Sequence, residues 1–371
     1  MRSDFLVIGG GIAGASAGYF LAASGSVTLL EREAVPGYHS TSRSAALFSE
    51  YYGNAVVRAL TAASRPFYLS PPAGFTTPLV TPRGVLALGP RGAEDRFDEV
   101  LAAGLTAPTP VREIEAAEAR RHCPVLRPGW FSRAMLKPAA MDIDVDAVHQ
   151  GFLRGIRAHG GRVLHPARLL ALGRRGGRWH AVTDQGEISA GGVVNAAGAW
   201  ADEVAAMAGA DPVGLTPLRR TAFIVAPPDG SGVTGWPMVN DVTDTFYFKP
   251  ESGRLLISPS DATPVPPGDA RPEDIDVAAA IERVQAATTL RIRHVRQAWA
   301  GLRTAAADDT PVIGEVPGTP GFCWLAGLSG YGIQSAPATG QFAAALLTGR
   351  PPLLPGRPRI DPAAISPRRL L

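Results

Sequence analysis

The sequence predicts an α/β fold in which a Rossmann-like domain is joined to a discontinuous α+β domain carrying an antiparallel sheet. Three observations support this: a glycine-rich turn between an apolar run and a helical segment at the start, a second apolar run closed by an acid, and a strand-rich middle region with Pro/Gly-rich turns. The 371 residues suffice for one large or two interleaved domains with a proper core.

The first thirty residues carry the most regular pattern. Residues 4–8 form a short apolar run, residues 12–23 are rich in small residues with helical character, and residues 27–30 form a second apolar run that ends at Glu31. This order predicts a strand, a glycine turn, a helix and a second strand. Residues 32–44 are rich in Pro, Gly, Ser and Thr, which predicts a loop.

Capping residues and turn residues predict the remaining elements. Asp144 is expected to cap a helix that runs to about residue 159 and closes at Gly160 and Gly161. Turns at residues 176–177 and 185–186 divide residues 162–194 into a meander. Further helices are expected at residues 54–68, 114–121 and 275–288 and before Gly349, and further strands at 79–88, 215–258 and 322–326.

The composition is ordinary for a soluble globular enzyme, with 19% charged residues and a net charge of +3. The arginine excess is spread along the chain, so no basic tract indicates nucleic-acid binding. Cys123 and Cys323 cannot form a disulfide framework and fit a reducing compartment. Because glycines interrupt the first apolar run and no stretch is long enough to span a bilayer, we expect a cytoplasmic protein without a signal peptide.

The glycine turn has the spacing of a dinucleotide-binding fingerprint, Gly9-x-Gly11-x-x-Gly14, with Glu31 at the end of the next strand. Gly9 permits a tight turn, Gly11 lets the backbone approach a pyrophosphate, and Gly14 lets the helix pack close to the strand. The phosphates would lie at the helix N-terminus, and Glu31 would accept hydrogen bonds from the adenosine ribose. The fingerprint alone does not distinguish NAD from FAD.

Four further blocks resemble the FAD-dependent amino-acid oxidases and dehydrogenases of the D-amino-acid-oxidase type. They follow one another in the expected order over nearly the whole chain. Within this family the sequence is most similar to bacterial D-arginine dehydrogenases, and glycine and sarcosine oxidases are more distant. The blocks are residues 37–46 (GYHSTSRSAA), 194–200 (VNAAGAW), 299–303 (WAGLR) with 310–314 (TPVIG), and 330–334 (GYGIQ).

The resemblance implies an FAD-binding domain made of residues 1–46, 140–212 and 295–371. Residues 47–139 and 213–294 would form the substrate-binding domain, with the ligand held between its antiparallel sheet and the flavin. Some members of the family tether FAD through a cysteine, but residues 302–307 contain none, so we expect noncovalent FAD.

The expected FAD contacts come from all of these blocks. Gly330 and Gly332 precede a helix in which Pro337 is tolerated early, and its N-terminus would stabilise negative charge on the reduced flavin. The predicted cofactor-binding residues are Gly9, Gly11, Ile12, Ala13, Gly14, Glu31, Arg32, Ser42, Arg43, Ala45, Ala46, Ala197, Gly198, Trp200, Gly301, Arg303, Gly330, Tyr331, Gly332, Ile333 and Gln334.

Oxidation of an amino acid by a flavin mainly requires positioning, because the carboxylate must be held so that the Cα–H points at flavin N5. We predict that Arg220 and Arg303 hold the carboxylate, since a guanidinium binds it through two hydrogen bonds. Adjacent strand residues face opposite sides, so Arg219 is expected at the surface. By the resemblance, Tyr52 and Tyr247 cover the substrate, with core packing as the alternative. Gln334 and the Gly330 carbonyl would complete the amine side.

Two positions depart from the D-arginine enzymes. Val85 stands where those enzymes place an acid for the guanidinium, and Leu47 stands where they have a histidine near the flavin. The sequence therefore predicts a D-amino acid with a neutral or apolar side chain, because a buried cation without its partner is unfavourable. The alternative is an N-substituted glycine with a hydrophobic arm, oxidised as by a glycine oxidase. Glu50 could replace the lost acid, which keeps basic substrates open.

Other classes are less consistent with these motifs. They are an aromatic-hydroxylating flavin monooxygenase, an NAD-dependent dehydrogenase, and a flavin-binding subunit that depends on partner chains. The acidic residues Asp142, Asp144 and Asp146 lack the glycine turn and distal glutamate of a calcium loop, so helix capping is expected and no metal site is predicted. The sequence does not distinguish oxygen from a quinone as the electron acceptor.

Overall fold

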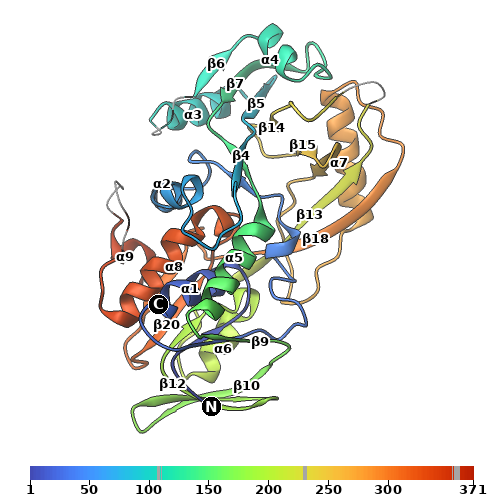
Figure 1. The fold of residues 1–371 in the computed structure, drawn as a ribbon. Helices are drawn as coiled ribbons and strands as arrows, with labels where there is room; N and C mark the ends of the chain where they lie inside the picture. Colours follow the sequence, from blue (N-terminus) through green and yellow to red (C-terminus); the bar gives the residue numbers. More distant parts are fainter. Residues whose placement is uncertain (107–108, 110, 229–231, 353, 355–359) are drawn as a thin grey trace.

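The computed structural model describes residues 1–106, 109, 111–228, 232–352, 354 and 360–371. It contains two large sheets, one in each half of the view in Figure 1, and both chain termini lie in the lower half. No helix within these ranges is long and apolar enough to cross a membrane.

The lower sheet has eight strands and contains the predicted Rossmann-like core. β1 pairs in parallel with β2 on one side and β12 on the other, as the opening motif predicts. The strands are β1 (Arg2–Ile8), β2 (Val27–Leu30), β9 (Arg162–Leu164), β10 (Leu169–Arg175), β11 (Arg178–Thr183), β12 (Gly186–Asn195), β19 (Val312–Glu315) and β20 (Phe322–Ala326).

Among the helices that share one apolar core with this sheet are α1 (Ile12–Ala22), α5 (Val145–Ala158) and α8 (Gly332–Thr348). The predicted caps are present. The Asp144 carboxylate accepts a hydrogen bond from the Ala147 N–H at 2.9 Å, and Gly349 ends α8 with φ +67°. Because α1 packs against both α5 and α8, its N-terminus is held firmly above the carboxyl ends of β1 and β2.

The upper sheet has nine strands and is antiparallel apart from the β5–β14 pair. One face packs against α4 (Ala116–His122) and α7 (Asp274–Ala287) in a second core. The strands are β5 (Val85–Pro90), β6 (Arg112–Ile114), β7 (Phe131–Lys137), β13 (Thr216–Val225), β14 (Met238–Asp241), β15 (Tyr247–Glu251), β16 (Arg254–Ser258), β17 (Thr263–Pro264) and β18 (Val295–Ala305). The opposite face, which carries Arg220, Ala222 and Tyr247, is called the inner face below.

β18 connects the two halves of the molecule. Its residues 295–305 pair with β13 along almost the whole strand, so they complete the upper sheet although the sequence grouped residues 295–371 with the FAD-binding part. Residues 299–303 alternate as a strand does: Trp299, Gly301 and Arg303 face one way, and Ala300 and Leu302 face the other. This alternation suits the block to pairing with β13. This block was interpreted as a motif and not as a strand.

The remaining elements are short or connect the two halves. The sequence did not predict α3 (Glu94–Leu105), whose Phe97 packs on β5 and β7. The others are α2 (Ala55–Leu69), α6 (Ala201–Met207), α9 (Pro362–Ile365), three short helical turns (Thr41–Arg43, Gly198–Trp200 and Pro367–Arg369) and a three-stranded sheet of β3 (Leu47–Phe48), β8 (Met141–Ile143) and β4 (Val80–Pro82).

Candidate active site

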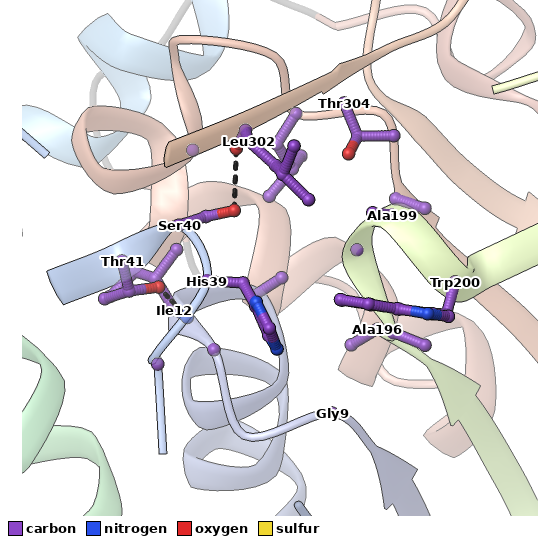
Figure 2. A pocket seen from close by; sticks show the side chains of 18 of the residues that line it. Gly9, Ile12, His39, Ser40, Thr41, Ala196, Ala199, Trp200, Leu302 and Thr304 are labelled. Atoms are coloured by element: carbon purple, nitrogen blue, oxygen red, sulfur yellow. Dashed lines mark hydrogen bonds between the residues drawn. The ribbon is translucent and has the colours of Figure 1, made fainter. Parts of the chain in front are cut away.

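A cavity of about 270 Å³ opens between the glycine turn of the lower sheet and the inner face of the upper sheet (Figure 2). It lies at the carboxyl ends of β1, β2 and β12, where ligands of parallel α/β sheets bind. Of the predicted residues, it is lined by Gly9, Gly11, Ile12, Ala13, Glu31, Arg32, Arg43, Ala45, Ala197, Gly198, Trp200, Arg220, Tyr247, Gly301, Arg303, Gly330, Gly332 and Ile333.

The glycine turn permits backbone contacts that a side chain would prevent. Gly9 has φ +109°, and a Cβ built there would lie 2.3 Å from the Ala196 carbonyl oxygen. A Cβ on Gly14 would lie 1.9 Å from the Gly9 carbonyl oxygen, so this glycine fits the helix against the strand and does not line the cavity. Both roles agree with the physical reasons given for the fingerprint.

Three side chains hold the turn in place. One Glu31 oxygen accepts a hydrogen bond from the Gly10 N–H at 2.8 Å, and the Thr41 hydroxyl accepts one from the Ile12 N–H at 3.0 Å. The buried His149 donates from Nε2 to the Gly10 carbonyl oxygen at 2.8 Å. Because burial lowers the pKa of His149, its ring is neutral at pH 7 and donates as the Nε2–H tautomer.

A cluster of aromatic and charged side chains borders the cavity on the side of the loop after β2. The His39 ring lies 4.7 Å from the Trp200 ring, and Figure 2 shows both beside the glycine turn. The Arg32 guanidinium lies 4.3 Å from the Trp200 ring centre. Glu33 accepts hydrogen bonds from both Arg32 and His39, at 3.1 and 2.9 Å. The cluster thus joins the loop after β2 to the turn after β12.

Arg43 lines the cavity, but its guanidinium is engaged by the protein. It donates to the backbone carbonyl oxygens of Tyr38, Ala270 and Ala300 at 2.7–2.9 Å and pairs with Asp269 at 2.5 Å. This arginine therefore fastens the loop of residues 37–46 to β18, and its charge is already matched by a carboxylate.

Arg220 and Arg303 lie at the upper end of the cavity together with Tyr247. The Arg220 Nε is buried and has no hydrogen-bond partner among the described residues. Arg303 donates to the Tyr52 hydroxyl oxygen at 3.3 Å. Tyr247 is 6% exposed, and Tyr52 is 39% exposed at the rim. Two cations and the Tyr247 phenol therefore line one space, with Tyr52 bonded to one of the cations, and this is a suitable environment for a small carboxylate.

The loop before α8 is shaped around Arg303. A Cβ on Gly330 would lie 2.8 Å from an Arg303 guanidinium nitrogen, so only glycine leaves this position free. The following Tyr331 donates to the Asp309 carboxylate at 2.6 Å, and its ring packs edge-on against Tyr52. Tyr331 therefore packs against Tyr52 and does not line the cavity.

Arg219 is buried, whereas the sequence predicts a surface position. It is 6% exposed and pairs with Asp276 at 2.7 Å, with Asp261 at 3.5 Å and with Glu273. The alternation of the strand does separate it from Arg220, but the face it reaches is covered by the start of α7, whose acidic residues bind it. The prediction that Arg219 and Arg220 face opposite sides of the strand is thus confirmed, and the prediction that Arg219 is exposed to solvent is wrong.

Several predicted residues lie outside the cavity lining. Ser42 and Ala46 border a second, neighbouring cleft, together with Asp142 and Lys249. The remaining residues in this group are Tyr52, Tyr331 and Gly14, described above, and Gln334, Leu47 and Val85. The Gln334 side-chain oxygen accepts from the Ser49 N–H at 3.1 Å, and its amide nitrogen has no partner in the described ranges. Leu47 pairs with Asp142 in the small sheet, and Val85 begins β5.

Sequence reasoning missed other lining residues. Tyr38, His39, Ser40 and Thr41 fall in a quoted block but were not chosen individually. Residues 167–169 line the cavity because they follow β9, and β9 pairs in parallel with β2. The rule for the carboxyl ends of parallel strands would have found them if β9 had been recognised as part of that sheet. His149 carried no signal, because its role depends on how α5 crosses α1.

The cavity has the features that a dinucleotide requires. Glycines allow close backbone approach, Ile12 and Ala13 present the start of a helix, and Glu31 lies at the end of the second strand. FAD fits these residues, and the fold and cavity define a nucleotide-dependent oxidoreductase. The chain belongs to the FAD dependent oxidoreductase (DAO) family, whose model matches residues 4–346.

The chain is also similar to individual amine and amino-acid oxidoreductases. Dimethylglycine dehydrogenase from mouse mitochondria is 26% identical over 95% of this chain, which spans less than half (43%) of that protein. Glycine oxidase from Bacillus licheniformis is 26% identical over 94% of both chains. The crystal structure of glycine oxidase from Geobacillus kaustophilus superposes with a TM-score of 0.83 at 21% identity and covers 98% of each chain.

Proposed function

We propose that the chain oxidises an amine that carries a carboxylate on its reacting carbon, either an N-substituted glycine or a D-amino acid. The observation that carries the proposal is the meeting of Arg220, Arg303 and Tyr247 at one end of the cavity, with Tyr52 bonded to Arg303. The similarity to glycine oxidases along the full chain supports the first substrate class.

The residues act mainly by orientation. Arg220 and Arg303 bind the two carboxylate oxygens, and Tyr247 and Tyr52 close the space around them and exclude water. Bound FAD supplies the hydride acceptor. The substrate loses a hydride from Cα and a proton from nitrogen, and water then hydrolyses the imine to an oxo acid and an amine or ammonia. Noncovalent attachment is part of the proposal, because the two cysteines of the chain are buried in other elements.

A cationic substrate arm is disfavoured. Val85 supplies no charge, and Glu50, the acid that could replace it, is buried and paired with Arg65 at 3.1 Å. A second cation beside this pair would compete with Arg65 for one carboxylate. We therefore expect basic amino acids to be poor substrates.

The test is anaerobic reduction of the purified yellow protein with a panel of N-alkylglycines and D-amino acids. Loss of the flavin absorbance with members of either class supports the proposal, and the preferred class identifies the chemistry. Flavin that stays oxidised with the whole panel would overturn it. Because the chain spans less than half of its dimethylglycine dehydrogenase relatives, turnover of the lone chain with an artificial acceptor is measured in parallel, and its absence would indicate dependence on partner chains.

A further inference from the structure

The chain contains only two lysines, Lys137 and Lys249, among its 36 basic residues. Both are buried in the upper sheet, with 9% and 4% exposure. Arginine is the usual cation in buried positions, whereas the ammonium group of lysine is a compact, strongly hydrated charge that is costly to bury. Two buried lysines in a chain that otherwise uses arginine indicate positions with a specific task.

The strand register places both lysines on the inner face. Lys137 in β7 lies opposite Val85 in β5, and Val85 lies opposite Met238 in β14. Two residues further along β14, Asn240 lies opposite Tyr247. Residues that oppose one another or are two apart share a face, so Lys137 projects from the face that carries Tyr247. Lys249 is two residues after Tyr247 and shares that face as well.

The two lysines differ in their partners. Lys249 is matched by two carboxylates, Asp142 at 2.9 Å and Glu251 at 3.1 Å. The Lys137 ammonium group forms no salt bridge or hydrogen bond with any residue that the structure describes, and it lies 5.7 Å from the centre of the Tyr51 ring. Burial lowers the pKa of Lys137 to about 8, so at pH 7 its ammonium group is charged and has no counter-ion among the described residues.

The position of Lys137 fits the far end of a bound substrate. β7 is three strands from β15, about 14 Å at ~4.8 Å per strand, on the side away from Arg220. If Arg220 and Arg303 hold the substrate carboxylate, Lys137 can be reached only by a group at the end of a substrate side arm. Between them lie two apolar residues, Val85 and Met238.

We propose that Lys137 binds a second carboxylate at the end of the substrate's arm. The substrate class is then an N-substituted glycine or D-amino acid with an acidic arm, in place of the neutral or apolar arm that Val85 and Leu47 suggested. This inference rests on the proposed function, because it assumes that the first carboxylate is held by the two arginines.

The first test observes the ammonium group directly. Because the chain has two lysines, labelling lysine with ¹³C at Cε gives two NMR signals, and Lys249 serves as the internal reference. A non-oxidisable dicarboxylate, in which a thioether sulfur replaces the amine nitrogen, is titrated into the oxidised holoenzyme. The expected result is that the pKa of Lys137 rises by at least one unit on binding while the Lys249 signal is unchanged. An unchanged Lys137 pKa with saturated ligand would overturn the proposal.

The second test uses matched substrate pairs. Anaerobic flavin reduction is measured with N-(carboxyalkyl)glycines of two to five methylenes and with N-alkylglycines of equal length, and likewise with D-amino acids. The wild type should favour the acidic member of a pair by tenfold or more. Lys137→Met should bring this ratio to about one, and Lys137→Arg should retain part of it. A ratio near one in the wild type refutes the role of Lys137 but leaves the proposed function intact; no reduction by any compound refutes the proposed function itself.

Discussion

The two sheets serve the site in different ways. Around the lower sheet, the cavity is formed by backbone: glycines, a helix start and side chains such as Glu31 and His149 that hold the turn. On the inner face of the upper sheet, charged side chains are presented, and the outcome for each depends on its partners. Arg219 and Lys249 are matched by acids, whereas Arg220 and Lys137 have no matching carboxylate among the described residues.

This difference between the two sheets bears on which groups contribute to the free energy of ligand binding. A backbone site binds the part of a ligand that never varies, such as a pyrophosphate, and requires no buried side-chain charge. An unmatched buried cation is unfavourable in the free protein and becomes favourable when an anion arrives. Under the proposed function, the partnered cations of the upper sheet have structural roles and the unpartnered cations bind the substrate.

The largest expected effect tests the two arginines that are proposed to bind the substrate carboxylate. Arg303→Ala should lower kcat/KM by about a thousandfold, because it removes a charged partner of the substrate carboxylate (about 4 kcal/mol). FAD should stay bound, because the glycine turn is untouched. Stopped-flow reduction and the flavin content of the purified variant measure the two properties. Arg303→Lys is the matched control and should recover part of the rate, whereas wild-type kinetics in Arg303→Ala would remove this residue from the clamp.

The adjacent arginines give the sharpest comparison. Arg219→Met should lower the free energy of unfolding by about 3 kcal/mol, because it leaves Asp261 and Asp276 without their cation. Arg220→Met should leave stability nearly unchanged and instead raise KM strongly. Urea unfolding and steady-state kinetics of both variants separate the roles. Equal losses of stability in the two variants would mean that the acidic partners of Arg219 do not give it a structural role that Arg220 lacks.

A third prediction concerns the backbone site. Gly14→Ala should weaken FAD binding by about a hundredfold, because its Cβ would lie 1.9 Å from the Gly9 carbonyl oxygen and force the helix away from the strand. The dissociation constant is measured by flavin fluorescence. Gly173→Ala is a suitable control, since no atom lies within 4 Å of a Cβ there and its φ is not positive. Tight FAD binding by Gly14→Ala would show that the turn tolerates more than its geometry indicates.

The smallest effect has the opposite sign. Lys137→Met should raise the free energy of unfolding by about 2 kcal/mol at pH 7. This is less than the ~3.5 kcal/mol that the whole shift of the pKa from 10.5 to about 8 corresponds to, at ~1.4 kcal/mol per pKa unit. Below pH 8 the ammonium is charged in both folded and unfolded wild type, so its burial cost is complete. Between pH 8 and 10.5 the folded protein releases the proton first, wild-type stability rises, and the variant's advantage should fade. A constant difference across this range in urea unfolding would contradict the assignment.

Much of the lower half could be predicted from sequence, because the determinants are local. The spacing of Gly9, Gly11 and Gly14 and the acid at Glu31 specify a strand, a turn and a helix within thirty residues. The upper half could be predicted only in outline. The exposure of Arg219 depends on α7, fifty residues away, and the role of β18 depends on its register with β13. Neither relation is encoded in a short window of residues.

The row of residues from β7 to β14 has a consequence for how such an enzyme can change. Lys137, Val85 and Met238 stand side by side on three neighbouring strands, and none of them lines the dinucleotide cavity. Selection, natural or in the laboratory, can therefore vary this row without replacing a residue of the cavity lining, although Met238 packs against the apolar cluster that contains Tyr247. A small combinatorial library at these three positions would test substrates with different side arms while the reaction stays the same. The protein would then serve as a starting point for engineering amine oxidation.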